Sequence, residues 1–183
     1  MAEQLTKTAW LDHGLSTLAR DGIHAVKAEP MAKALAVSRG SFYWHFRDIA
    51  DFRTQLLQRW QESMTDRIIA EHAAGNESGR SLQQLIRRGF GSRQRLDHAV
   101  RLWALDDPAA ASAVAIVDGR RIDHIATLIE EAGIDRETAR ARATFLYWAV
   151  LGQALVAAPG LASLPEAKID AIGHMLSSPV RSP

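Results

Sequence analysis

The fold of this chain is decided by the stretch Gly22-Ile-His-Ala-Val-Lys-Ala-Glu-Pro-Met-Ala-Lys-Ala-Leu-Ala-Val-Ser-Arg-Gly-Ser-Phe-Tyr-Trp-His-Phe46. Met31, Ala32 and Leu35 form one small apolar face, and Val37 fills the turn that follows. Phe42 and Phe46 are four residues apart, so they lie on one face of a short helix that begins after Ser38. The pattern predicts two short helices joined by a tight turn, which is a helix–turn–helix.

The second of these helices carries large or polar side chains on the side away from Phe42 and Phe46. They are Arg39, Ser41, Tyr43, Trp44 and His45. Exposed aromatic side chains lower solubility, but they suit a helix that lies on DNA. Arginine bonds guanine through two parallel hydrogen bonds, and hydroxyl, indole and imidazole groups reach phosphate oxygens. The alternatives are that Tyr43 and Trp44 belong to a core and that His45 is merely solvated.

The length and composition of the chain are those of one large packed domain or of two small ones. The 183 residues are 47% hydrophobic and 23% charged, which excludes a disordered activator or a fibrous repeat. Cysteine is absent, which excludes disulfides, thiolate metal sites and cysteine nucleophiles. The 31 Ala and 19 Leu favour helices, and alternating strand patterns are scarce. We therefore expect an all-α fold of about nine helices.

Helix boundaries follow from caps and breakers along the chain. Asp48, Asp107 and Asp135 are expected N-caps, and Gly133 closes a helix. The expected helices are 6–20, 28–35, 38–46, 49–73, 82–90, 95–105, 108–131, 136–157 and 165–176. The run 75–79 is the clearest linker. We expect a helix–turn–helix head at residues 1–48 and a ligand-binding and dimerisation body at residues 49–183.

Residues 37–46, read as Val-Ser-Arg-Gly-Ser-Phe-Tyr-Trp-His-Phe near the N-terminus and ahead of a long helix, resemble the tetracycline-repressor (TetR) family. The resemblance is close over residues 6–60 and rests on length and helix count beyond them. It implies a recognition helix at residues 38–46, with Arg39 and Gly40 reading bases and Trp44 packing near a base or sugar. It also implies that Ser41, Tyr43 and His45 hold phosphates.

The chain departs from the family pattern at three positions. Lys27 stands where the family has a phosphate-binding threonine, and it can contact the same phosphate by charge. Ala36 replaces a glycine, at a cost of roughly 1 kcal/mol if the turn needs positive φ. Ile49 replaces a lysine, and Arg47 is a candidate substitute for that phosphate contact.

The segment from Ala143 to Leu151 is apolar on all sides, which predicts burial on more than one face. Its small-residue side predicts a dimer interface made by Phe145, Ala149, Gly152 and Val156. The resemblance agrees, since the last two helices of the family usually form a four-helix interface between protomers. The alternative is that this helix is the centre of a monomeric core.

A ligand pocket is expected among aromatic and apolar residues of the body. The candidates are Trp60, Met64, Trp103, Arg121, His124, Tyr147 and Trp148. Arg121 and His124 interrupt an apolar stripe, so Arg121 meets either a ligand anion or a carboxylate such as Asp118 or Asp106. His124 is either a ligand contact or a satisfied core histidine.

Together these patterns predict a homodimeric, ligand-responsive transcriptional repressor that binds a near-palindromic operator in double-stranded DNA. Residues 27–47 hold four cationic side chains against Glu29, a local charge of +3 within an overall charge of +1. We expect no catalysis, cofactor or metal, because the seven histidines form no metal-ligand spacing. With no signal peptide or membrane span in view, we expect a cytoplasmic protein. The alternative function is a helical small-molecule-binding or adaptor protein that does not bind DNA.

Overall fold

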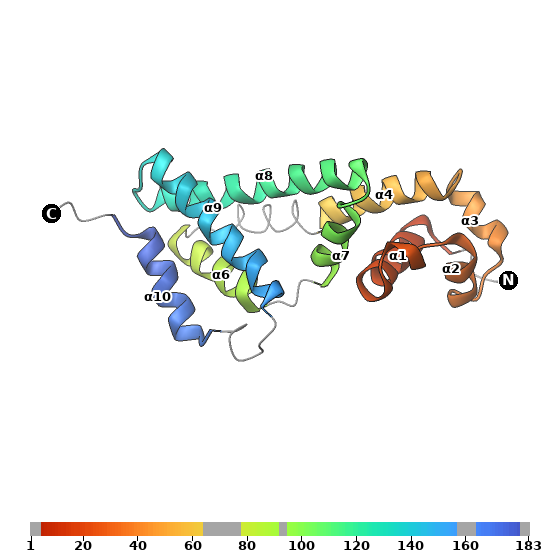
Figure 1. The fold of residues 1–183 in the computed structure, drawn as a ribbon, viewed down its shortest axis with the longest axis horizontal. Helices are drawn as coiled ribbons and strands as arrows, with labels where there is room; N and C mark the ends of the chain where they lie inside the picture. The colour runs from red at the N-terminus through yellow and green to blue at the C-terminus, as the bar shows by residue number, and fades with distance from the viewer. Residues whose placement is uncertain (1–4, 64–77, 92–94, 157–163, 180–183) are drawn as a thin grey trace. The chain divides into compact units, whose positions relative to one another are not determined.

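The computed structural model describes residues 5–63, 78–91, 95–156 and 164–179. Every regular element in these ranges is helical, as the sequence predicts (Figure 1). The chain divides into two compact units. Unit 1 comprises Met1–Asp66 and Gln94–Ile116, and unit 2 comprises Arg67–Arg93 and Val117–Pro183. The predicted boundary at residue 48 separates a DNA-binding part from a ligand-binding part, not two compact units. It stays a prediction.

Unit 1 begins with α1 (Lys7–Asp21), whose first turn is capped by the Thr6 hydroxyl, which accepts the Ala9 N–H at 3.2 Å. It continues through the 3-10 turn η1 (Ile23–Ala25), α2 (Ala28–Ala34), α3 (Arg39–His45) and α4 (Ile49–Gln61). It ends with α7 (Arg95–Trp103) and the first part of α8 (Pro108–Glu131). Both α4 and α7 pack against α1.

An aromatic cluster holds α3 in place. The Phe42 ring lies 5.3 Å from the rings of Trp10 and Phe52, and the Phe46 ring lies 4.8 Å from that of Phe52. All four side chains are buried, so α1, α3 and α4 share one apolar core. Gly14 on α1 permits this packing, because a Cβ there would lie 2.6 Å from Phe52 Cζ.

Unit 2 contains α6 (Ser78–Gly91), the later part of α8, α9 (Arg136–Gly152), the 3-10 turn η3 (Gln153–Leu155) and α10 (Glu166–Ser177). Its core is built from aliphatic residues of all four α-helices. They include Leu82, Ile86, Ile125, Ile129, Leu146 and Ile169. Arg87 on α6 pairs with Asp170 on α10 at 2.5 Å and with Glu166 at 2.8 Å, so charge pairs tie these helices together at the surface.

The expected N-caps are confirmed. Asp48 accepts the Asp51 N–H at 2.8 Å, Asp107 accepts the N–H groups of Ala109 and Ala110, and Asp135 accepts that of Thr138. Each bond is local, which is why the sequence alone predicts it.

Three predicted boundaries need correction or fall outside the described residues. Helix α6 begins at Ser78, so residues 78–79 of the predicted linker are helical, and residues 75–77 lie outside the described ranges. Helix α9 ends at Gly152 rather than at residue 157, and η3 follows it. Helix α4 runs to Gln61, and the predicted continuation from residue 64 to residue 73 lies outside the described ranges.

Candidate nucleic-acid interface

Helix α3 separates its buried and exposed residues as the sequence predicts. Phe42 and the C-cap residue Phe46 are buried, while Trp44 is 75% exposed and Tyr43 is 47% exposed. Arg39 and Gly40 are also exposed, and Ser41 is half-buried. A seven-residue helix thus presents a tryptophan, a tyrosine and an arginine to the outside while its phenylalanines fix it to the head. Burial in a core is therefore the wrong interpretation of Tyr43 and Trp44.

Arg39 and Tyr43 act as a pair on this surface. The Arg39 Nη2 donates to the Tyr43 hydroxyl at 3.0 Å, and the guanidinium carbon lies 5.4 Å from the centre of the Tyr43 ring. This hydrogen bond to the Tyr43 hydroxyl is the main reason that the pKa of Arg39 is raised above its usual value. This pairing leaves the guanidinium charged and restrains its direction, because residues four apart on a helix lie one above the other.

His45 is held by the chain itself. Its Nε2 lies 2.7 Å from the carbonyl oxygen of Leu5, and the side chain is half-buried. This bond ties the end of α3 to the segment before α1. His45 therefore has a structural contact that the sequence did not predict, and its predicted phosphate contact stays a prediction.

Gly40 leaves the start of α3 open. A Cβ at this position would meet only the Ser38 hydroxyl, at 3.6 Å, which is an ordinary van der Waals distance. Packing inside the chain therefore does not require a glycine here. A missing side chain on the outer surface allows another backbone or a base edge to approach closely.

The residues at the predicted departures lie around α2 and the start of α4. Ala36 has a φ of +54°, so the predicted strain in the turn is present. Lys27 is exposed at the N-cap position of α2, and its side chain makes no capping bond there. Ile49 is half-buried at the first position of α4.

Arg47 lies in the connection between α3 and α4. Its backbone N–H donates to Asp51 at 3.0 Å, and its Nε lies 3.3 Å from the Asp48 carboxylate in an exposed ion pair. The bond from the Asp51 N–H is the main cause that lowers the pKa of Asp48. The pKa of Asp51 is lowered chiefly by the Gln55 side-chain amide. The carboxylates thus stay ionised and hold the Arg47 backbone beside α3.

Comparison with known proteins identifies this arrangement. Residues 11–55 match the sequence model of the family described as "Bacterial regulatory proteins, tetR family". These residues are therefore similar to the N-terminal DNA-binding domain of that family. The match runs from within α1 to within α4, and it includes the helix–turn–helix and the buried rings of Phe42, Phe46 and Phe52.

Solved structures share the fold over almost the whole chain. A TetR-family member from Streptomyces coelicolor A3 is 22% identical, with a TM-score of 0.63 over 93% of this chain and 96% of its own. A transcriptional regulator from Saccharomonospora viridis, solved with choline, is 20% identical with a TM-score of 0.70 over 91% of each chain. FadR from Bacillus subtilis, solved with stearoyl-CoA, is 14% identical with a TM-score of 0.67 over 96% of this chain and 100% of its own. The predicted TetR-family regulator fold is confirmed.

The predicted effector residues of this chain are not gathered in one place. In unit 1, Trp60 is fully buried with an indole N–H that has no hydrogen-bond partner, and Trp103 lines a pocket. Met64 lies outside the described residues. In unit 2, Tyr147 is buried and its hydroxyl donates to Asp118 at 2.7 Å. The roles of these residues in binding stay predictions.

Arg121 and His124 on α8 are both half-buried, as the interrupted apolar stripe predicts. The Arg121 Nη1 lies 3.5 Å from the Tyr147 hydroxyl, which itself bonds to Asp118. Arg121 therefore reaches Asp118 through Tyr147. This chain of contacts supports a structural role for Arg121, and it also places three polar groups together.

Helix α9 carries three of the predicted dimer residues, and the fourth, Val156, follows η3. Phe145 is 62% exposed, Val156 is also exposed, and Ala149 and Gly152 are half-buried. Trp148 is 65% exposed and lies on the surface with Phe145 rather than in the core with Tyr147. The two residues differ in exposure because consecutive residues on a helix point about 100° apart, and the predicted role of Trp148 in ligand binding stays a prediction. The helix is thus buried on one side only within a single chain.

Sequence reasoning missed two further exposed apolar residues of unit 2. Leu155 on η3 and Met175 on α10 both have most of their side chains exposed. For Leu155 the available signal was its position directly before the predicted interface residue Val156. Among the described residues, no helix is long and apolar enough to cross a bilayer, and no group of three side chains is placed to bind a metal.

Proposed function

We propose that this chain is a homodimeric transcriptional repressor that binds a near-palindromic operator through residues 38–46 of each protomer and is released by a small-molecule effector. It works by binding rather than by catalysis, and it acts in the cytoplasm. The observation that carries the proposal is the outer surface of α3. There Arg39, Tyr43 and Trp44 are exposed on a helix that Phe42 and Phe46 fix to the head.

The chemistry of this surface suits a DNA groove. Arg39 presents a guanidinium already restrained by Tyr43, and a guanidinium matches the two acceptors on the guanine edge. The Tyr43 and Ser41 hydroxyls and the exposed Lys27 and Arg47 reach phosphates. Trp44 packs against a sugar or a base edge. The charge of +3 over residues 27–47 adds a salt-sensitive attraction to the backbone.

Two copies are needed because one short helix reads too few base pairs. Helix–turn–helix proteins bind half-sites about 34–36 Å apart as two-fold dimers. In this chain the dimer forms through the exposed side of α9, with Phe145 and Trp148 at its centre and Val156 after η3 at its end. Apolar side chains exposed in a single chain become buried when two copies of α9 pack together.

The effector binds in the C-terminal part of the chain and shifts the spacing of the two recognition helices away from one turn of DNA. Support comes from two relatives of the same fold, which were solved with choline and with stearoyl-CoA. These ligands differ so much in charge and size that the fold does not specify the effector. In this chain the polar group of Asp118, Arg121 and Tyr147 is the contact that we assign to it.

A mobility-shift assay tests the proposal, with the full chain and DNA fragments from upstream of its own gene at low salt. We expect a shifted complex that unlabelled fragment displaces and that Arg39→Ala weakens. Arg140→Ala is the control, since Arg140 is an exposed arginine on α9 that pairs with Asp123. Binding to none of the fragments favours the second candidate, a ligand-binding protein that does not bind DNA. The observation that favours this second candidate is the half-buried Ile49, which stands in place of a phosphate-binding lysine.

A further inference from the structure

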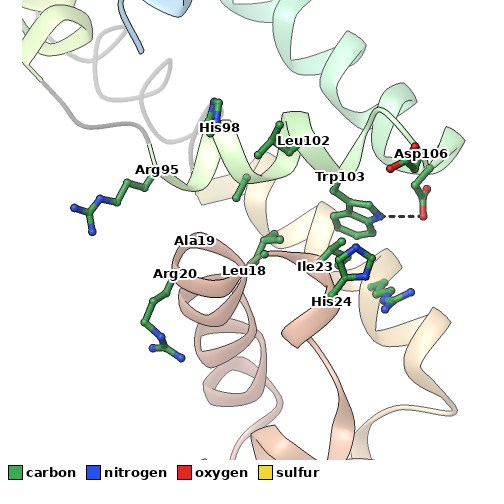
Figure 2. A pocket seen from close by; sticks show the side chains of 14 residues that line it. Leu18, Ala19, Arg20, Ile23, His24, Arg95, His98, Leu102, Trp103 and Asp106 are labelled. Carbon is green, nitrogen blue, oxygen red and sulfur yellow. Dashed lines mark hydrogen bonds between the residues drawn. The ribbon is translucent and has the colours of Figure 1, made fainter. Parts of the chain in front are cut away.

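Unit 1 contains a pocket that the proposed function does not use. It has a volume of about 530 Å³ and lies where the end of α1, η1, α4, α7 and the turn before α8 meet (Figure 2). Small-molecule sites have volumes of roughly 300–1,000 Å³. Of the predicted effector residues only Trp103 lines it, and none of its lining residues belongs to unit 2.

One wall of the pocket is formed by apolar side chains. Leu18, Ile23, Leu102 and Trp103 all line it, and Leu102 is 53% exposed. The indole N–H of Trp103 already donates to Asp107 at 3.0 Å, so the ring offers apolar surface to a ligand. A flat apolar group seated here removes the exposed part of Leu102 from water, which favours binding.

Arg53 brings a positive charge to the pocket, and the charge acts on the Asp107 carboxylate without a hydrogen bond from the Arg53 Nε. It comes from α4 and is half-buried, and its Nε is buried without a hydrogen-bond acceptor. Asp107 is the nearby carboxylate, but Ala109, Ala110 and Trp103 already donate to its oxygens. A buried donor that lacks an acceptor is costly, and a ligand that brings one removes the cost.

The carboxylates at the pocket disfavour a second negative charge at their end of it. Asp106 and Asp107 both line the pocket, so a second anionic group meets carboxylates. Figure 2 shows Trp103 and Asp106 toward one end of the pocket, and Arg20 and Arg95 toward the other. Arg20 is paired with Asp21 at 2.8 Å, which leaves Arg53 as the half-buried cation for a ligand.

We propose that this pocket binds a small aromatic monocarboxylate, with Arg53 as its charge partner and Leu102 and Trp103 as its apolar wall. Guanidinium and carboxylate groups form paired, charge-assisted hydrogen bonds, and the flat ring fills the space beside Trp103. The ligand touches α1, α4 and α7 together. The site is separate from the effector site of the proposed function and does not depend on DNA binding.

Calorimetric titration of the full chain with naphthalene carboxylate and its neutral analogue, naphthalene carboxamide, tests the proposal without DNA. We expect the carboxylate to bind about tenfold or more tightly than the carboxamide, because only the carboxylate pairs with Arg53. Arg53→Met should abolish this difference. Arg59→Met is the matched control, since Arg59 lies on the same helix, pairs with Asp12 and does not line the pocket.

A second variant covers the case in which Arg53→Met fails to fold. Ala99 lines the pocket from α7, and Ala99→Met fills the space while keeping every charge. We expect it to weaken binding of the carboxylate about tenfold or more at an unchanged thermal midpoint. Equal affinity for carboxylate and carboxamide overturns the proposal. So does carboxylate binding that a folded variant leaves intact, or no binding by the wild-type chain at millimolar concentration.

Discussion

Ala36 occupies the turn between α2 and α3 with a φ of +54°, a backbone conformation in which an L side chain is strained. We expect Ala36→Gly to raise the free energy of unfolding by about 0.5–1 kcal/mol, because glycine adopts this conformation without the clash of a Cβ. Urea unfolding measures the change. Ala34→Gly, two residues earlier in α2, is the control and should lower the free energy by a similar amount. Two changes of the same sign contradict the assignment of strain to Ala36.

The structure changes the role that we expect for Tyr43 in DNA binding. The sequence assigns Arg39 to bases and Tyr43 to phosphate, but the hydrogen bond between them couples the two roles. We expect Tyr43→Phe to weaken operator binding by about three- to tenfold and also to reduce the preference for operator over unrelated DNA. Fluorescence anisotropy with both DNAs measures this. Tyr147→Phe, at the chain's other tyrosine, should leave the preference unchanged. Uniform weakening on all sequences means that the pair does not orient Arg39.

At the scale of the element, the first turn of α8 is capped by Asp107. Asp107 accepts the N–H groups of Ala109 and Ala110, and the bond from Ala110 is the main cause that lowers the pKa of Asp107 below its ordinary value of 3.8. A lowered folded-state pKa contributes stability that is fully present above the unfolded value. That stability disappears as the pH falls through the folded value.

We therefore expect Asp107→Ala to lower the free energy of unfolding by about 1 kcal/mol at neutral pH. The difference from the wild-type chain should shrink as the pH falls below about 4, because the protonated carboxyl accepts less well. Urea unfolding across this pH range gives both numbers. Asp106→Ala is the neighbouring control and should change neither, because Asp106 is exposed and α8 is capped by Asp107. A difference that persists undiminished in acid excludes the cap as its source.

Helix ends show what the sequence could and could not predict. The caps at Asp48, Asp107 and Asp135 were predictable because each is decided by a side chain and the backbone within three residues of it. The start of α6 at Ser78 was not, because the packing of Leu82 and Ile86 in unit 2 outweighs the weak helix propensity of the residues before them.

The same distinction applies to the candidate site, where local features were predictable and contacts between distant residues were not. The exposed face of α3 was predictable, since Phe42 and Phe46 alone determine which way Tyr43 and Trp44 point. The contact of His45 with the Leu5 carbonyl was not, because it joins residues 40 apart in the sequence. Pockets are likewise formed by distant segments. Arg53 and Trp103 come together only through the packing of α4 and α7 on α1.

At the scale of the whole molecule, the net charge does not show how charge is distributed along the chain. The overall charge of +1 combines a head with +3 over residues 27–47 and a remainder near −2. One head brings few contacts to DNA, but a dimer brings twice as many. Because each phosphate contact adds to the salt dependence of binding, dimerisation should steepen it. DNA affinity is therefore linked to the apolar surface of α9, although α9 itself needs no contact with DNA.

Phe145→Glu tests this link. A glutamate at this exposed position leaves the core of unit 2 intact, so the variant should still unfold cooperatively, with a thermal midpoint lowered only by the loss of the dimer contacts. It also places like charges on both copies of α9, so sedimentation should give the 20.1 kDa monomer instead of twice that mass. Operator affinity should then fall at least tenfold, with a shallower dependence on salt. Ala111→Glu, an exposed position on α8 in unit 1, is the control and should keep the dimer. A Phe145→Glu variant that stays dimeric moves the interface away from α9, and a monomer that retains full operator affinity breaks the link between dimer and DNA.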